Sequence, residues 1–170
     1  KKNSKINENS PLNLTNSYAK SHILAENFLK KSVDKKKILI LRLANCFGRP
    51  ANKKKSLWKL VINNICLNIH KNREIKINSN KNFFRNFISI NYFIFILGYF
   101  FKNKKLNGIF NITSSNSISI LEISNIIKKR YENLFKKKIK ISHNINKENM
   151  KTNIYSKNFN KLLTKKNNYF

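Results

Sequence analysis

The sequence predicts an α/β fold, in which helices and strands alternate along the chain. Two observations indicate this class. Short runs rich in branched aliphatic residues, typical of strands, recur between longer segments with apolar residues three and four positions apart, typical of amphipathic helices. Hydrophobic residues make up 41% of the 170 residues, which is enough for one packed domain with a sizeable core.

The first expected helix covers residues 18–31. Asn16 and Ser17 precede it, and both residue types are suitable N-caps. Residues 37–43 follow as a run of branched aliphatic side chains, which predicts a strand buried on both faces of a parallel sheet. A loop is expected over residues 44–55 because this segment contains a glycine and a proline.

A second helix is expected over residues 56–72, with Ser56 in the capping position. Two short strands, 75–77 and 87–90, are expected on either side of a turn over residues 78–82.

A capping box, S-x-x-E, marks the start of a later helix at Ser119 and Glu122. The remaining expected elements are helices over 92–101 and 156–163 and strands over 108–113 and 139–142.

The strong positive charge has a compositional explanation. The formal net charge is +29, which invites a nucleic-acid interpretation. Yet the chain holds 31 Lys, 31 Asn and 24 Ile, the residues of AT-rich codons, and only five Arg. Faces that bind nucleic acids usually combine Arg with exposed aromatic residues. We therefore favour drift in composition over nucleic-acid binding.

Several site types are excluded by residue counts. The three glycines are Gly48, Gly98 and Gly108, so no G-x-G-x-x-G turn and no Walker loop exists in this sequence. Two cysteines cannot form a four-cysteine zinc site, and the three histidines lack the spacing of metal ligands, so no metal is predicted.

The sequence gives no sign of a membrane segment. The most apolar stretch, residues 87–101, is interrupted by Ser89 and Asn91 and is shorter than the ~20 apolar residues that a spanning helix needs. The first residues are polar and contain no apolar core of a secretion signal. We therefore expect a cytoplasmic protein with free thiols at Cys46 and Cys66.

Three segments, taken in order, resemble one known family. The family's patterns are Y-x-x-x-K with a nearby A-E, then R-x-x-N-x-y-G-P, and then R-D-F-I followed by a y-N-(I/V)-g-s-g turn and an S-I helix start. Together the segments resemble the extended short-chain dehydrogenase/reductases, the NAD-dependent epimerase/dehydratases that act on nucleotide sugars. The three segments are YAKSHILAE over 18–26, LRLANCFGRP over 41–50 and FRNFISI over 84–90, the last of which is followed by GIFNITS over 108–114 and SISI over 117–120.

The resemblance is to the second half of such an enzyme. It implies the C-terminal part of a Rossmann-type doubly wound sheet in residues 1–55, with the Tyr-x-x-x-His helix. Residues 56–170 would form a small substrate-binding α/β subdomain with interleaved sheet elements. The N-terminal dinucleotide-binding half would be missing, so we expect a fragment that is inactive alone. NAD is the implied cofactor of the intact enzyme and is not expected to bind this chain by itself.

The resemblance makes Tyr18 the candidate general acid/base. A phenol has a reference pKa of about 10, so it needs a nearby cation to exchange protons near neutral pH, and position i+4 lies on the same helix face. In the family that position is Lys, which also holds the nicotinamide ribose; here it is His22. Tyr18 and His22 are thus assigned to catalysis and cofactor binding. The alternative is an amphipathic pair on a packed helix.

The resemblance also implies contacts to cofactor and substrate. The backbone of Leu43 and Ala44 would contact the nicotinamide amide, and Asn45 the nucleotide diphosphate or the sugar. Arg85 matches the Arg of R-D-F-I and would clamp the pyrophosphate, since Arg binds phosphate in a bidentate manner better than Lys does. The Asp of that motif is Asn86 here.

Two further expectations concern neighbouring residues. The short strand of Ile75, Lys76 and Ile77 would border the nucleobase. Arg42 is expected to have a structural role.

The preferred hypothesis is therefore a fragment of a nucleotide-sugar epimerase or dehydratase, with a nucleotide sugar as its small-molecule partner. Whether a homodimer or a separate N-terminal half completes it stays open, as do the sugar and the choice among epimerase, dehydratase and reductase. The alternatives are a small basic RNA-binding α/β protein and a degenerate chain that folds without catalysing a reaction.

Overall fold

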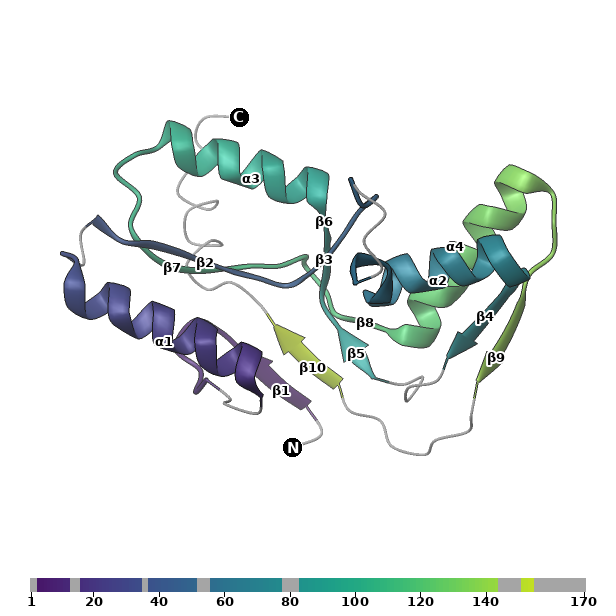
Figure 1. Cartoon of the computed structure of the whole chain (residues 1–170), viewed down its shortest axis with the longest axis horizontal. Helices are drawn as coiled ribbons and strands as arrows, with labels where there is room; N and C mark the ends of the chain where they lie inside the picture. The colour runs from purple at the N-terminus through teal and green to yellow at the C-terminus, as the bar shows by residue number, and fades with distance from the viewer. Residues whose placement is uncertain are drawn as a thin grey trace.

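The computed structural model describes residues 3–12, 16–34, 37–51, 56–77, 83–143 and 151–154. Helices and strands alternate along this part of the chain, which confirms the α/β class (Figure 1). The elements are β1 (Asn3–Ile6), α1 (Ser17–Ser32), β2 (Leu39–Leu43), β3 (Asn45–Phe47), the 3-10 helix η2 (Leu57–Lys59), α2 (Val61–Asn72), β4 (Glu74–Ile77), β5 (Phe84–Arg85), β6 (Phe87–Ser89), α3 (Ile90–Lys102), β7 (Gly108–Ile112), β8 (Ile118–Ser119), α4 (Ile120–Phe135), β9 (Lys140–His143) and β10 (Lys151–Ile154).

Most strand pairing in the described residues is parallel and links distant segments. The parallel pairs are β1 with β10, β2 with β7, β3 with β6, and β4 with β9, whereas β5 pairs with β8 in the antiparallel direction. In the longest pair, Leu39 lies opposite Gly108 and Leu43 opposite Ile112. Parallel strands need a crossover connection, and here helices supply it, as expected for a Rossmann-like fold.

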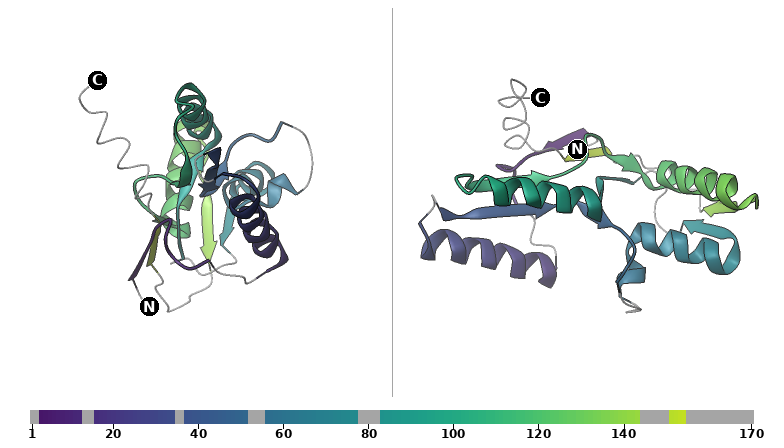
Figure 2. Two further views of the ribbon diagram at one scale, coloured as in Figure 1. Left: turned by 90° about the vertical axis from the view of Figure 1, so that its left-hand side faces the viewer. Right: turned by 90° about the horizontal axis from the view of Figure 1, so that it is seen from above.

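The core has two parts, one toward each end of the molecule. At one end, α1 and α3 lie on opposite faces of the β2–β7 pair; at the other, α2 and α4 lie beside β4 and β9 (Figures 1 and 2). The first part contains Ile88, Ile96, Phe100, Phe110 and Ile112. The second contains Ile62, Ile65, Ile69, Ile75, Ile77, Phe87, Ile120 and Ile139.

Local capping signals are confirmed. The Asn16 side chain accepts a hydrogen bond of 2.8 Å from the Ala19 amide at the start of α1. Both bonds of the predicted capping box are present, between Ser119 and Glu122. Each bond satisfies an amide that the helix itself cannot pair.

The predicted loop over residues 44–55 is wrong in its first part. Asn45–Phe47 forms β3, which pairs with β6, more than 40 residues further along the chain. Three residues beside a glycine carry no local strand signal, because their conformation is fixed by the partner strand. The predicted burial of the preceding strand is also wrong: Leu39 and Leu43, at the two ends of β2, are exposed.

The second helix begins later than predicted. Ser56 has a helical backbone conformation and forms no capping hydrogen bond, and a turn of 3-10 helix precedes α2. Leu60, which has an extended backbone conformation, is the N-cap residue of α2. Conversely, α3 begins two residues early, at Ile90, because the Ser89 side chain accepts from the Tyr92 amide.

Besides β3, the four short strands β1, β5, β8 and β10 were not predicted from the sequence. The expected turn over 78–82 and the expected helix over 156–163 lie outside the described residues.

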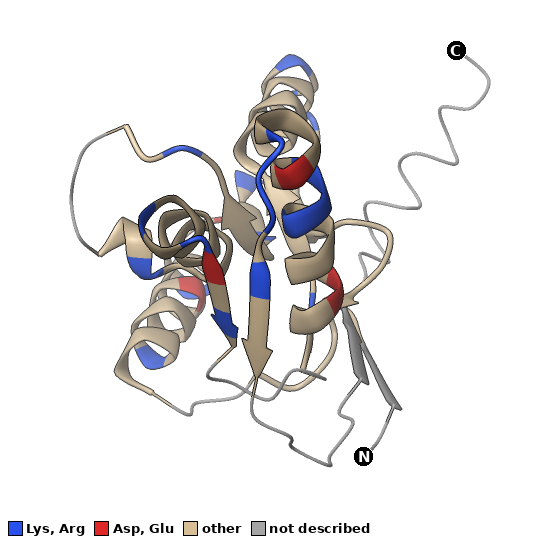
Figure 3. Ribbon diagram, turned by 90° about the vertical axis from the view of Figure 1, so that its right-hand side faces the viewer, with Lys and Arg blue, Asp and Glu red and all other residues tan. Residues whose placement is uncertain are grey.

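The positions of Lys and Arg are not confined to one element of the described part of the chain (Figure 3). Figure 3 shows Lys and Arg distributed over several helices, strands and loops. No helix in the described ranges is long and apolar enough to cross a membrane.

Candidate functional site

A charged network joins α1 to the strand beneath it. The Arg42 guanidinium on β2 donates to both carboxylate oxygens of Glu26 on α1, at 2.9 and 2.7 Å, and to the Glu8 carbonyl at 3.0 Å. The buried carboxylate of Glu8 in turn accepts from the Asn111 amide on β7 at 2.9 Å. This confirms the structural role expected for Arg42, which holds the helix and the preceding loop on the sheet.

Tyr18 and His22 lie together on the first turns of α1. Their ring centroids are 4.4 Å apart and the rings are tilted by 58°. Tyr18 is 72% exposed. The i+4 spacing therefore places the phenol and the imidazole on one face of the helix, open to a ligand or to another polypeptide.

The carboxyl end of β2 lies on the same side of the molecule as the start of α1, because helix and strand run in opposite directions (Figure 1). Leu43, the last residue of β2, is exposed, and the Ala44 amide donates to the Ile112 carbonyl at 3.0 Å. Ligands bind at the carboxyl ends of parallel strands in doubly wound folds. Leu43 and Ala44 thus occupy the edge at which a dinucleotide would be expected.

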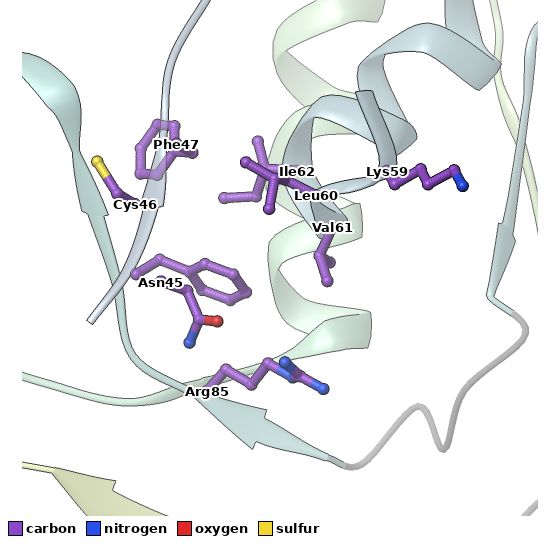
Figure 4. A pocket seen from close by; sticks show the side chains of 9 residues that line it. Asn45, Cys46, Phe47, Lys59, Leu60, Val61, Ile62 and Arg85 are labelled. Carbon is purple, nitrogen blue, oxygen red and sulfur yellow. The ribbon is translucent and has the colours of Figure 1, made fainter. Parts of the chain in front are cut away.

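A cavity of about 240 Å³ lies between β3, β5 and the start of α2, and we call it the Arg85 cavity (Figure 4). Asn45 and Arg85, two residues singled out from the sequence, both line it. The complete lining is Asn45, Cys46, Phe47, Lys59, Leu60, Val61, Ile62, Arg85 and Phe87.

The Arg85 side chain contacts an aromatic ring and keeps one buried donor without a partner in the described part of the chain. Its guanidinium carbon lies 5.0 Å from the centroid of the Phe83 ring, within the range of a cation–π interaction. Its Nε is buried and has no hydrogen-bond partner in the described part of the chain. A buried N–H without a partner costs about 1–3 kcal/mol.

The polar wall opposite Arg85 is held by backbone contacts. The Asn45 side-chain amide donates to the Asn86 carbonyl at 3.0 Å, and the Asn45 backbone amide donates to the same oxygen at 3.2 Å. Asn45 is therefore anchored rather than a freely rotating loop residue.

Cys46 also lines the Arg85 cavity, and its thiol is held in the protonated form. Burial raises the pKa of its thiol above the ordinary value, against a smaller opposing effect of a backbone hydrogen bond. The thiol is therefore protonated at neutral pH, and a protonated thiol is a poor nucleophile.

A second cavity of about 190 Å³ shares Lys59 and Val61 with the first. Lys76 and Ile77 of β4 line it, so two of the three residues expected at the nucleobase reach this cavity. The third, Ile75, is fully buried in the core and lines neither cavity.

The structure thus brings together Asn45, Arg85, Lys76 and Ile77 around two neighbouring cavities. Tyr18 and His22 are not part of this group, because no residue of α1 lines either cavity. Sequence analysis missed Lys59, which lines both cavities. One lysine among 31 carries no signal of its own, and the predicted helix over 56–72 placed it inside a helix instead of at the mouth of a cavity. In the described residues, no group of three His, Cys, Asp or Glu could hold a metal ion.

Solved structures with the same fold are nucleotide-sugar enzymes. dTDP-4-dehydrorhamnose reductase from Yersinia enterocolitica superposes with a TM-score of 0.69 at 20% identity, covering 93% of this chain and 54% of that one. dTDP-glucose 4,6-dehydratase from Bacillus anthracis, in complex with NAD, gives 0.66 at 16% identity, covering 95% and 49%. UDP-N-acetylglucosamine 4-epimerase from Bacillus cereus gives 0.59 at 23% identity, covering 86% and 47%.

This chain therefore spans about half the length of the solved structures that it matches. No curated protein gives a significant match to it. The family model described as "NAD dependent epimerase/dehydratase family" matches residues 1–113. Since that match covers more than half of the chain and agrees with its Rossmann-like fold, this protein belongs to the NAD dependent epimerase/dehydratase family.

Proposed function

We propose that this chain is the substrate-binding part of an NAD-dependent enzyme that epimerises or dehydrates a nucleotide sugar. The observation that carries the proposal is the buried, unpartnered Nε of Arg85 in a cavity that also contains Asn45 and Lys59. A planar guanidinium suits the two oxygens of a phosphate group.

The two cavities suggest how a nucleotide diphosphate would lie. Its pyrophosphate would bind the Arg85 guanidinium, with Lys59 adding positive charge between the two cavities. The nucleoside would extend toward β4, where Ile75–Ile77 supply the backbone and Lys76 a second cation. The sugar would lie on the side of Asn45.

The chemistry would take place at α1. Tyr18 would exchange a proton with a sugar hydroxyl, and His22 would assist it and contact the nicotinamide ribose. NAD, when bound to the intact enzyme, supplies the hydride acceptor. The residues of this chain fit only one part of that cofactor: the exposed Tyr18–His22 pair and the end of β2 at Leu43 and Ala44 are available, but the sequence holds no glycine turn for the phosphates.

We assign the cofactor-binding and substrate-binding roles to two different parts of the chain. Residues 1–55 would belong to the dinucleotide-binding domain and residues 56–170 to the substrate-binding subdomain. The active enzyme would also need a glycine-rich dinucleotide-binding half, because these 170 residues contain no glycine turn. Such an enzyme would work in the cytoplasm, where it would supply nucleotide sugars for polysaccharide biosynthesis.

The test is nucleotide binding by the Arg85→Lys variant of the full 170-residue chain, with UDP as the probe in titration calorimetry. The substitution keeps the charge and removes the planar fork, so we expect the affinity to fall by about 1–3 kcal/mol, or roughly 5- to 150-fold. Arg130→Lys, at an exposed residue outside both cavities, is the control and should bind as the wild type does. Equal affinities for all three proteins would overturn the proposal.

A further inference from the structure

We propose that Asn86 is the positioning residue of the Arg85 cavity, and that it fixes Asn45 so that the cavity offers a hydrogen-bond donor and an acceptor side by side. The inference rests on the proposed function and adds to it. It predicts that the ligand carries a hydroxyl or N–H donor next to its phosphate.

Asn86 is built into the structure at the junction of two strands. It lies between Arg85, the last residue of β5, and Phe87, the first residue of β6, and it is fully buried at 0% exposure. Its side-chain nitrogen donates to the carbonyls of Ser114 and Asn116, at 3.0 and 3.3 Å. Its side-chain oxygen accepts from the Ser114 amide and hydroxyl, at 2.8 and 3.1 Å.

These four hydrogen bonds fasten the Arg85 strand to the turn after β7. Arg85 immediately precedes Asn86 in the chain, so the position of its side chain depends on these four hydrogen bonds. Asn45 depends on it as well, since its backbone and side-chain amides both donate to the Asn86 carbonyl. One buried residue therefore holds the two polar walls of the cavity.

The same contacts determine which end of the Asn45 amide is offered to a ligand. Only the NH2 end can donate to a carbonyl, so the bond to Asn86 turns the nitrogen toward the backbone. Figure 4 shows the Asn45 oxygen turned toward the side of the cavity where Val61 lies. An amide oxygen accepts from hydroxyl or N–H groups and repels phosphate oxygens. Arg85 would thus bind phosphate, and Asn45 a neighbouring donor such as a sugar hydroxyl.

An aspartate at position 86 could not make this set of contacts. A carboxylate has the same shape as the amide but only accepts hydrogen bonds, and it would face the two carbonyls of Ser114 and Asn116. Both carbonyls would lose their donor, and a buried charge would be added. The asparagine therefore makes two hydrogen bonds here that the Asp of the R-D-F-I pattern could not donate, whereas the bonds accepted from Ser114 are open to either side chain.

The experiment compares Asn86→Asp with the wild-type full chain, using UDP and UDP-glucose as probes in titration calorimetry. Because the variant loses two hydrogen bonds that hold both walls, we expect the affinity for UDP-glucose to fall about tenfold or more, and the advantage of UDP-glucose over UDP to disappear. Asn116→Ala is the matched control: it leaves the backbone carbonyl that Asn86 uses, and both affinities should be unchanged.

Side-chain NMR separates this inference from the proposed function. In the wild type, the NH2 protons of Asn86 should exchange slowly with solvent, and the Arg85 Nε–H signal should shift in Asn86→Asp but not in Asn116→Ala. Rapid exchange of the Asn86 protons in the wild type would overturn the inference even if the variant does not fold. So would unchanged binding in a folded Asn86→Asp. If the wild type binds neither probe, the proposed function fails, and the two NMR signals still decide the role of Asn86.

Discussion

Glu26 shows how strongly one carboxylate can be tied to its surroundings in a very basic chain. Hydrogen bonds from the Arg42 guanidinium hold the pKa of Glu26 below its ordinary value near 4.5, and desolvation opposes them only in part. Lys30 contributes a weaker contact at 3.3 Å. Because the folded protein favours the ionised form, Glu26 stabilises the fold above the pKa that it has in the unfolded chain.

The Glu26→Gln variant should therefore be less stable than the wild type at pH 7, by about 1–2 kcal/mol after allowance for partial solvent screening. The difference should shrink as the pH falls below about 4.5 and through the lowered pKa of Glu26, where the wild-type carboxylate also becomes neutral. Urea unfolding at several pH values between 3 and 7 measures it. A difference that does not change with pH would mean that Arg42 and Glu26 do not interact as an ion pair.

The second prediction at this scale concerns His22 and the pH dependence of activity. An imidazole is only partly protonated at neutral pH, whereas a lysine ammonium is charged throughout the neutral range. In an enzyme completed with a dinucleotide-binding half, His22→Lys should raise activity at about pH 7–8, because a permanent cation makes the Tyr18 phenol a better proton donor and acceptor. The pH–rate profile tests this, with Tyr18→Phe as the inactive reference. An unchanged profile, or an active Tyr18→Phe, would remove α1 from the active site.

At the level of elements, Gly48 and Gly98 differ in how much space surrounds them. A Cβ on Gly48, after β3, would lie 2.6 Å from Cγ2 of Ile90 at the start of α3. A Cβ on Gly98, within α3, would meet no atom within 4 Å. Gly48 therefore allows β3 and α3 to approach closely, whereas Gly98 only lowers the helix propensity of α3.

We expect Gly48→Ala to destabilise the fold by about 1–3 kcal/mol through overpacking, and Gly98→Ala to stabilise it by about 0.5–1 kcal/mol. Thermal unfolding of the two single variants gives the comparison, and the pair differs only in position. If Gly48→Ala melted at or above the wild-type temperature, the close packing of β3 against α3 would be refuted.

The sequence predicted those elements whose signals are local. The caps at Asn16 and Ser119 and the i+4 pair of Tyr18 and His22 depend on residues a few positions apart, and all three are confirmed. The strands β1, β5, β8 and β10 have two to four residues each and exist only as partners of distant segments. For the same reason Asn45 was expected in a loop, and the contribution of Lys59 became visible only when β3, β5 and α2 were brought together.

At the scale of the whole molecule, α1 and β2 expose several large apolar side chains to solvent. No residue of α1 is buried, and Leu24 and Phe28 on this helix are each 68% exposed. Leu39 and Leu43 of β2 are exposed as well. At this end of the described structure, apolar side chains of a helix and of a strand are therefore exposed to solvent.

The prediction at this scale concerns the binding of NAD by the 170-residue chain. The 170-residue chain should show no measurable NAD binding, since it lacks the glycine turn that places the pyrophosphate at a helix N-terminus. Equilibrium dialysis with NAD measures this, and UDP in the same apparatus is the positive control. Saturable NAD binding at micromolar concentrations would show that the cofactor has another anchor in this chain.

The pairing of β1 with β10 has a consequence for how the protein is made. Asn3 lies opposite Lys151, 148 residues further along the chain. A ribosome adding about 5–20 residues per second needs roughly 7–30 s to deliver that partner after β1 has been synthesised. Throughout this interval the backbone of the nascent β1 has open hydrogen-bonding groups, which are a template for pairing with other chains. In the described part of the chain, β1 therefore has no partner strand until β10, the last strand described, has been translated.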